Sequence, residues 1–306
     1  MFSQKVKKGG ALLEADHSLE ELDAASGRAL VHEEGESREL RTLSPEEFLQ
    51  ISLSRPLPQK LYLDQGRDFL SAVLHLSEAK DNYYIKITGG CLYWEKAQSE
   101  VLAVFATALQ KYRGALGAGG TRSENIFDET DIRPGMPELG PIIERQNIDA
   151  KVLGLLPGGT LSLDTRLNDV TVVVDQFREK TWKIKLHDEQ RHVLVASKET
   201  AYPWSAEGDL NERVVKALDG VSPLRGATII AFDGGQGTRE EIEKWERIHL
   251  ADGEATVLLV TGGDSKRTTD SLANNLEWRA RRPWVYTVPL DAEKIEAALR
   301  YLSAIR

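Results

Sequence analysis

The sequence predicts an α/β protein in which helices sandwich a Rossmann-like parallel sheet, with a small N-terminal extension. From residue 83 onward, apolar runs of strand length alternate with helical patterns, and several of these runs end in Gly-Gly turns. Near-continuous apolar strands are typical of a parallel sheet that helices cover on both faces. We therefore divide the chain into an extension, residues 1–75, and a Rossmann-like domain, residues 76–306.

The N-terminal extension lacks this alternation. Residues 28–43 have the pattern of a polar hairpin, and residues 44–49 have that of a short capped helix. Residues 55–58, Arg-Pro-Leu-Pro, are expected to link the extension to the main domain.

The elements of the main domain follow from the lengths of the apolar runs and from their periodicity. Strands are expected at residues 84–88, 114–118, 151–156, 171–174, 192–196, 227–232, 256–260 and 284–288. Helices are expected at residues 95–112, 136–146, 210–218, 238–250, 268–279 and 292–305.

The most informative motif lies between the expected strand 227–232 and the helix after it. It consists of Asp233, Gly234, Gly235, Gln236, Gly237 and Thr238. Glycine adopts backbone angles that are closed to other residues, and the free N–H groups at the start of the next helix favour an anion. The motif therefore predicts a phosphate-binding turn, in which Thr238 adds a hydroxyl contact or caps the helix. A plain strand-to-helix corner is the alternative interpretation.

Three further glycine turns follow other expected strands. They contain Thr88, Gly89 and Gly90; Gly119, Gly120, Thr121 and Arg122; and Gly262, Gly263, Asp264 and Ser265. Because all strands of an open parallel sheet end at one edge, the turns are expected to converge on one ligand-binding crevice. Asp264 and Ser265 could bind a ribose or a phosphate there, although Ser265 is equally suited to cap the next helix.

Two arginines and a glutamate are candidates for contacts with a phosphorylated ligand. Arg213 lies on the helix before strand 227–232, and Arg122 follows a glycine turn directly; either guanidinium could bind a phosphate, or Arg213 could be an ordinary exposed helix residue. Glu241 lies near the start of the helix after the main motif, where the helix dipole also favours a carboxylate. The histidines His75, His187, His192 and His249 are scattered, so we expect them to be structural or solvated.

Composition excludes several classes of protein. The 306 residues carry a net charge of −9, which argues against long-range attraction to nucleic acid. No apolar run approaches the roughly 20 residues that a membrane span needs, and the start lacks the pattern of a signal peptide, so a cytoplasmic protein with no membrane partner is expected. Cys91 is the single cysteine, and neither a metal site nor a cofactor is indicated. The usual Gly-x-Gly-x-x-Gly fingerprint of dinucleotide oxidoreductases is missing after Ile87.

The set of glycine turns resembles that of the SLOG superfamily over about residues 80–306. This superfamily includes the LOG phosphoribohydrolases and the LSDAT-type N-terminal domain of melastatin-type TRP channels, and the chain looks most like the prokaryotic branch related to the channels. LOG enzymes carry Pro-Gly-Gly-x-Gly-Thr-x-x-Glu, a pattern that places its final glutamate on Glu241 and implies that Arg213 is its catalytic partner. Asp233 replaces the proline, as in the channel-type loop, and the stretch from Arg213 to the loop is longer than in LOG enzymes.

The resemblance implies two alternative functions. The first is a signalling domain that senses a nucleotide-derived small molecule such as ADP-ribose, without turnover. The second is a hydrolase that cleaves the N-glycosidic bond of a nucleoside monophosphate or a related nucleotide. The dimers of LOG enzymes also make self-association an expectation by resemblance.

Overall fold

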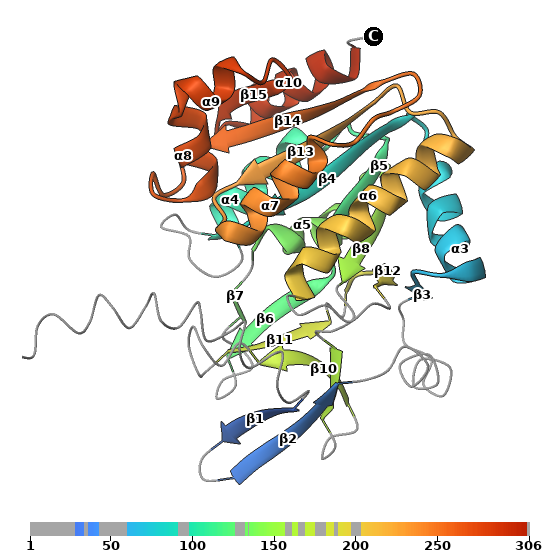
Figure 1. The fold of residues 1–306 in the computed structure, drawn as a ribbon, viewed down its shortest axis with the longest axis vertical. Helices are drawn as coiled ribbons and strands as arrows, with labels where there is room; N and C mark the ends of the chain where they lie inside the picture. The colour runs from blue at the N-terminus through green and yellow to red at the C-terminus, as the bar shows by residue number, and fades with distance from the viewer. Residues whose placement is uncertain are drawn as a thin grey trace, which may run out of the picture.

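The fold is built on an eight-stranded, all-parallel sheet with interleaved helices, and it is Rossmann-like (Figure 1). The computed structural model describes residues 28–33, 36–42, 60–90, 98–125, 132–133, 135–156, 161–164, 169–174, 182–186, 189–196 and 203–304. The strand order is β15-β14-β13-β4-β5-β8-β12-β3. The strands are β3 (Lys60–Leu63), β4 (Tyr83–Gly89), β5 (Ala115–Gly119), β8 (Lys151–Leu156), β12 (His192–Val195), β13 (Gly226–Phe232), β14 (Glu254–Thr261) and β15 (Val285–Pro289). The predicted fold class is therefore confirmed.

Helices cover both faces of this sheet. They are α3 (Gly66–Ser77), α4 (Gln98–Ala108), α5 (Leu139–Arg145), α6 (Pro203–Val221), α7 (Gln236–Trp245), α8 (Thr268–Asn274), α9 (Leu276–Ala280) and α10 (Ala292–Ala304), with the short 3₁₀ helix η1 (Met136–Glu138) before α5. The apolar residues of α3, α6, α7 and α8 pack in one core, and those of α4, α5 and α10 pack in another. Strand β13 supplies both cores from alternate positions, with Ala231 in the first and Phe232 in the second, as the period of a strand requires.

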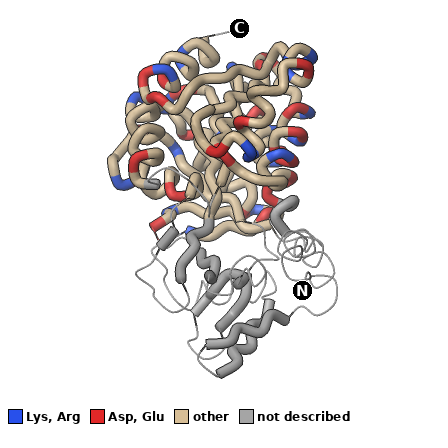
Figure 2. The backbone as a smooth tube through the Cα atoms, turned by 90° about the vertical axis from the view of Figure 1, so that its left-hand side faces the viewer, with Lys and Arg blue, Asp and Glu red and all other residues tan. Residues whose placement is uncertain are grey.

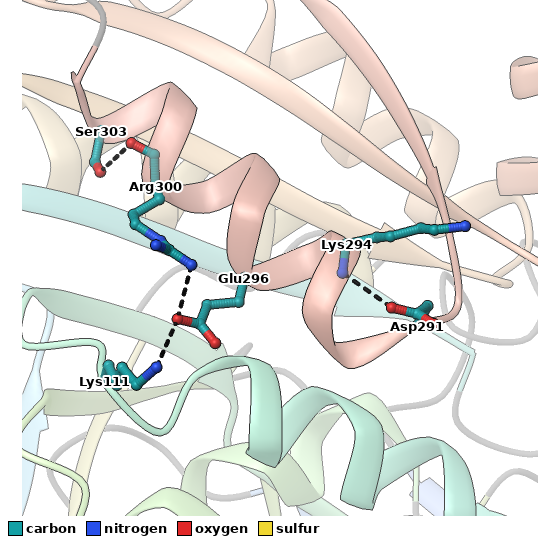
Figure 3. Close-up of polar contacts among 6 residues, drawn as sticks. All are labelled: Lys111, Asp291, Lys294, Glu296, Arg300 and Ser303. Atoms are coloured by element: carbon teal, nitrogen blue, oxygen red, sulfur yellow. Dashed lines mark hydrogen bonds and ion pairs between the residues drawn. The ribbon is translucent and has the colours of Figure 1, made fainter.

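The C-terminal helix α10 is fastened to the end of α4 by polar contacts (Figure 3). Glu296 accepts hydrogen bonds from Lys111 and from Arg300, each at 3.1 Å. At the start of α10, the carboxylate of Asp291 accepts the N–H of Lys294 at 2.9 Å and so satisfies one of the free N–H groups of the first turn.

A second sheet is antiparallel, and the sequence predicted only one hairpin of it. Its seven strands have the order β1-β2-β9-β10-β11-β6-β7. They are β1 (Arg28–Glu33), β2 (Glu36–Thr42), β6 (Thr121–Asn125), β7 (Ile132–Arg133), β9 (Leu161–Asp164), β10 (Asp169–Val174) and β11 (Trp182–Leu186). The hairpin expected at residues 28–43 is confirmed as β1 and β2, which pair antiparallel. Residues 171–174, expected among the strands of the main domain, lie in β10 of this second sheet instead.

The structure changes the expected start of the main domain and one expected helix, and two expected segments lie outside the described residues. Strand β3 and helix α3 belong to the parallel sheet and its helical layer, although the main domain was expected to begin only at residue 76. The helix expected at 268–279 is broken at Asn275, whose side chain accepts the N–H of Trp278 at 2.9 Å and caps α9. The helix at 44–49 and the linker at 55–58 lie outside the described residues.

Charged residues of both signs lie on the face of the molecule that Figure 2 draws. Lysine and arginine alternate with aspartate and glutamate along the outer helices (Figure 2), and many are paired, as Arg281 is with Glu277. Among the described residues, no helix is long and apolar enough to cross a bilayer.

Candidate functional site

Three of the four predicted glycine turns meet at one edge of the parallel sheet. Strands β4, β13 and β14 are neighbours, and their ends lie level, since Phe232 pairs with Gly89 on one side and with Val260 on the other. The turns after these strands therefore adjoin one another at the carboxyl edge, as the sequence predicted.

Gly89 allows the ends of β4 and β13 to come close together. Its φ is +152°, and a Cβ atom there would lie 2.1 Å from the carbonyl oxygen of Phe232 and 2.7 Å from Cγ of Met136. The next residue, Gly90, donates its N–H to the same Phe232 carbonyl at 3.1 Å and accepts the N–H of Met136 at 3.2 Å. Glycine at position 89 is thus required by contact as well as by conformation. The turn joins β4, β13 and η1. Thr88, the residue before it, is buried.

The first two residues of the loop after β13 have positive φ angles. Asp233 has φ +57° and Gly234 has φ +87°, and Gly235 is the N-cap residue of α7. No side chain caps α7; Thr238 is instead buried and packs against Gly234, where a Cβ would lie 2.2 Å from the Thr238 hydroxyl oxygen. Of the two roles predicted for Thr238, the structure thus excludes the cap.

The start of α8 holds the carbonyl groups of this loop. Thr269 donates to the carbonyl of Asp233 through its N–H at 3.2 Å and through its hydroxyl at 2.6 Å. Thr268 donates its N–H to Gly234 at 3.1 Å and its hydroxyl to Gly235 at 2.7 Å. Four hydrogen bonds therefore fix the loop from the carbonyl side.

The N–H groups on the other side of the loop have no such partners. Among the described residues, nothing accepts the N–H groups of Gln236, Gly237 or Thr238. Gly237 and Gln236 are at least partly exposed, and there is open space around Gly235 and Gly237. Free N–H groups and the positive end of the helix dipole give this turn the properties of an anion site.

The turn after β14 differs, because its N–H groups are already bound. Gly262, with φ +107°, and Gly263 donate to the two carboxylate oxygens of Asp270 at 3.0 and 3.3 Å. Asp264 accepts the N–H of Lys266 at 2.9 Å. Ser265 does not cap α8, since the N-cap residue is Arg267. The structure therefore places this predicted turn beside the site but leaves it without free amides at Gly262 and Gly263.

Asp233 adds a buried acid to the edge. Its side chain is 2% exposed and approaches Gly263, and its Oδ1 atom has no hydrogen-bond partner among the described residues. Burial raises the pKa of Asp233 to about 6, although Arg267 and the backbone of Asp264 act in the opposite direction. A buried acceptor without a donor is costly, so the position suits a hydrogen-bond donor from a ligand.

The fourth predicted turn has another structure. The chain passes from β5 through Gly119 and Gly120 directly into β6 of the antiparallel sheet, where Thr121 and Arg122 pair with β11. A strand follows the glycines where the sequence suggested a turn like the others. The positions of the Thr121 and Arg122 side chains lie outside the described part of the chain.

A buried ionic cluster lies under the site, and sequence reasoning missed most of it. Lys86 of β4 is 1% exposed, and its Nζ atom lies 2.5 Å from Oε1 of Glu207 on α6 and 3.9 Å from Oε1 of Glu241 on α7. Tyr84, on the same face of β4, donates its hydroxyl to Asn211 of α6 at 2.7 Å. The one available signal was a lysine within the apolar run Ile85-Lys86-Ile87, since a buried lysine requires a partner.

Glu241 is the least satisfied member of this cluster. Its side chain is 11% exposed, and its Oε2 atom has no hydrogen-bond partner by distance and angle among the described residues. Burial raises the pKa of Glu241 to about 7; Lys86 opposes this effect and Glu207 reinforces it, while the nearby Thr88 hydroxyl lowers the pKa. Burial lowers the pKa of Lys86, but the two glutamates outweigh it, so that the pKa is raised.

Arg213 is not brought into this cluster. It pairs with the carboxylate and the carbonyl of Asp64 after β3, and its guanidinium lies 4.9 Å from the ring centre of Phe69. In the described residues, no hydrogen bond or ion pair joins Arg213 to Glu241. The two residues that the LOG pattern implies to be catalytic partners therefore have separate partners here.

The predicted structural role of two histidines fits their surroundings. His75 and His192 stack with ring centres 3.7 Å apart, and Tyr62 lies 2.9 Å from Nδ1 of His192. His187 lies outside the described residues. Within the described part of the chain, no group of three or more histidine, cysteine, aspartate or glutamate side chains could hold a metal ion.

No protein-family model matches this chain, and no curated protein matches its sequence. The α/β fold and the geometry of the site are therefore the basis for assigning a function.

Proposed function

We propose that the chain is a sensor domain that binds a phosphorylated nucleotide derivative, such as ADP-ribose, at the carboxyl edge of the parallel sheet. The observation that carries this proposal is the row of N–H groups at Gln236, Gly237 and Thr238, which have no acceptor in the described residues at the start of a ten-residue helix. Such a helix start favours phosphate oxygens. The resemblance of the glycine turns to those of the SLOG superfamily supports a nucleotide as the source of the phosphate.

Two other features support a ligand that carries hydroxyl groups beside its phosphate. Oδ1 of Asp233, the residue that follows β13, has no donor among the described residues, and Asp264 lies on the adjoining turn. A ribose hydroxyl is a donor of the required kind.

The test compares two substitutions at one position. Gly235 has φ −115°, and nothing lies within 4 Å of the place where its Cβ would be, so aspartate and asparagine both fit. Both are also good N-cap residues, and the fold should remain stable in either variant. Only aspartate adds a negative charge. At about 5 Å and an effective dielectric constant of about 20, this charge costs about 3 kcal/mol per phosphate charge, or more than 100-fold in affinity.

Calorimetry and thermal shift with AMP, NAD, ADP-ribose and cyclic ADP-ribose provide the measurement, with adenosine as the ligand that lacks phosphate. We expect at least one phosphorylated ligand to bind the wild type and Gly235→Asn, and none to bind Gly235→Asp. Adenosine should bind much more weakly. Equal binding to the two variants would refute the phosphate site at α7, and failure of every ligand to bind the wild type would refute the nucleotide proposal.

A hydrolase of N-glycosidic bonds is the second candidate, and Glu241 is the observation that favours it. A carboxyl group with a pKa of about 7, and with an oxygen atom that has no partner among the described residues, is suited to proton transfer at neutral pH. The test is the release of free base from AMP and related nucleotides, followed by chromatography. Release by the wild type that Glu241→Gln abolishes would establish the enzyme, whereas binding without release supports the sensor.

A further inference from the structure

The buried cluster under the site contains two carboxyl groups and one ammonium group. Lys86, Glu207 and Glu241 are 1%, 13% and 11% exposed at their side chains, so water provides little compensation for their charges. With all three ionised, the cluster would carry a net negative charge in a region of low dielectric constant. Such a charge is disfavoured, and two nearby carboxyl groups normally reduce it by holding a proton.

The geometry indicates which carboxyl group holds the proton. Glu207 accepts a hydrogen bond from Nζ of Lys86 at 2.5 Å, whereas the nearest oxygen of Glu241 lies 3.9 Å from the same nitrogen, beyond hydrogen-bond distance. The second oxygen of Glu241 has no partner among the described residues. Lys86 therefore makes its hydrogen bond to Glu207, and Glu241 faces the ammonium group only across the longer 3.9 Å ion pair.

The remaining polar groups around Glu241 do not change this assignment. On α7, Lys244 lies one turn further on, and it pairs with Asp209 of α6 at 2.6 Å. On β4, the Thr88 hydroxyl is near Glu241, and Tyr84 is neutral and donates to Asn211 of α6. Lys244 also lowers the pKa of Glu241, but by less than Lys86 does.

We infer that Lys86 is a positioning residue that makes the two carboxyl groups unequal: its ammonium group is hydrogen-bonded to Glu207, so Glu241 is the member of the cluster that takes up a proton near neutral pH. The consequence for binding rests on the proposed function. Glu241 lies five residues into α7 from Gln236, about 8 Å along the helix axis from the free N–H groups. When Glu241 is protonated, it has no negative charge to repel an anion bound at the start of α7. The Lys86–Glu207 pair thereby favours anion binding at the start of α7.

The direct test observes the Glu241 carboxyl group without any ligand. In protein labelled with ¹³C at the glutamate carboxyl carbon, NMR should show one resonance that titrates near pH 7 and is missing in Glu241→Gln. In Glu207→Gln, Lys86 is free to pair with Glu241, so this titration should move down by more than about one pH unit. Asp209→Asn, which alters the more distant Lys244 pair, is the matched control and should leave it nearly unchanged. A wild-type Glu241 that titrates near the ordinary value for glutamate would overturn the inference, as would an unchanged titration in Glu207→Gln.

The second test measures the affinity for ADP-ribose between pH 6 and pH 8, a range in which its diphosphate charge stays constant. The wild type is expected to lose about tenfold in affinity as Glu241 ionises, and Glu241→Gln is expected to show no such loss. Binding that is equally pH-independent in both proteins would overturn the role in binding. If the wild type binds no nucleotide but the NMR titration is as expected, the proposed function fails while the assignment of the proton stands.

Discussion

Replacing Gly89 with alanine is expected to destabilise the protein strongly, because the new methyl group would enter the backbone of the neighbouring strand. The Cβ atom would lie 2.1 Å from the carbonyl oxygen of Phe232 and 2.7 Å from Cγ of Met136, and the φ of +152° is itself unfavourable for alanine. The Met136 side chain can move, but Phe232 is held in the ladders that join β13 to both β4 and β14. The strain must therefore be relieved by separating β4 from β13.

Three contributions add to the expected loss. Overpacking costs about 1–3 kcal/mol, the positive φ costs about 1–2 kcal/mol, and loss of the hydrogen bond from Gly90 to Phe232 costs about 1 kcal/mol. The sum, about 3–6 kcal/mol, is a large part of the total stability of a typical domain. Gly237→Ala is the matched control. It lies in a helix with open space around it, and alanine should stabilise it by up to about 1 kcal/mol.

Equilibrium unfolding in urea, monitored by circular dichroism, measures both free energies of unfolding. We expect Gly89→Ala to unfold at much lower urea than the wild type and Gly237→Ala at the same concentration or higher. A Gly89→Ala variant within about 1 kcal/mol of the wild type would show that β4 and β13 do not approach as closely as the structure has them.

Three further predictions concern buried titratable groups. Lys86→Met leaves Glu207 and Glu241 without their cation and should lower the free energy of unfolding in urea by about 3–5 kcal/mol. Adding Glu207→Gln to this variant should restore part of the loss. A Lys86→Met variant as stable as the wild type would refute the buried ion pairs of Lys86. The pKa of Asp233 is raised to about 6 from an ordinary 3.8, so ionisation of Asp233 destabilises the folded protein as pH rises between these values. The melting temperature of Asp233→Asn relative to that of the wild type should therefore increase from pH 4 to pH 7. A difference in melting temperature that stays constant over this range would contradict the prediction. Burial lowers the pKa of His192 to about 4 from an ordinary 6.5, so the stability present above pH 6.5 should be lost as pH falls toward 4. The His192→Phe variant should lose less stability than the wild type over the same range. Equal losses in the two proteins would count against the stacked His75–His192 pair as the cause.

The parallel sheet could be predicted from the sequence because its strands are buried on both faces. Residues 151–156 were expected as a strand and form β8 with the same limits, since the apolar run is continuous. The antiparallel sheet could not be found in this way. Its strand β11, Trp-Lys-Ile-Lys-Leu, alternates apolar and polar residues as a half-buried strand does, but this pattern does not identify its neighbours, and β2 pairs with β9 more than 100 residues away. Pairing between such distant segments leaves no local signal.

The glycine turns of the candidate site were also predictable, but their hydrogen bonding was not. Gly262-Gly263 and Gly234-Gly235 look alike in the sequence, yet the first turn donates its N–H groups to Asp270, eight residues further on. The role of Lys86 depends likewise on two helices that begin more than 100 residues later in the chain. Motif spacing identifies where N–H groups are available, and only the tertiary structure decides which of them remain free.

The difference in hydrogen bonding between the N-termini of α7 and α8 is the strongest reason to place an anion at α7. Both helices begin beside the loop after β13, and both have a first turn with N–H groups that need acceptors. Thr268 and Thr269 of α8 donate to the carbonyl groups of Gly234 and Asp233, so the start of α8 is used to hold the loop. Those bonds orient the loop with its carbonyl groups toward α8 and leave the first N–H groups of α7 without an acceptor in the described residues. A mutation that weakens the α8 contacts, such as Thr269→Val, should therefore reduce nucleotide affinity without touching the anion site itself. Calorimetry with ADP-ribose would measure this loss, and an affinity equal to that of the wild type would show that α7 is positioned by other contacts.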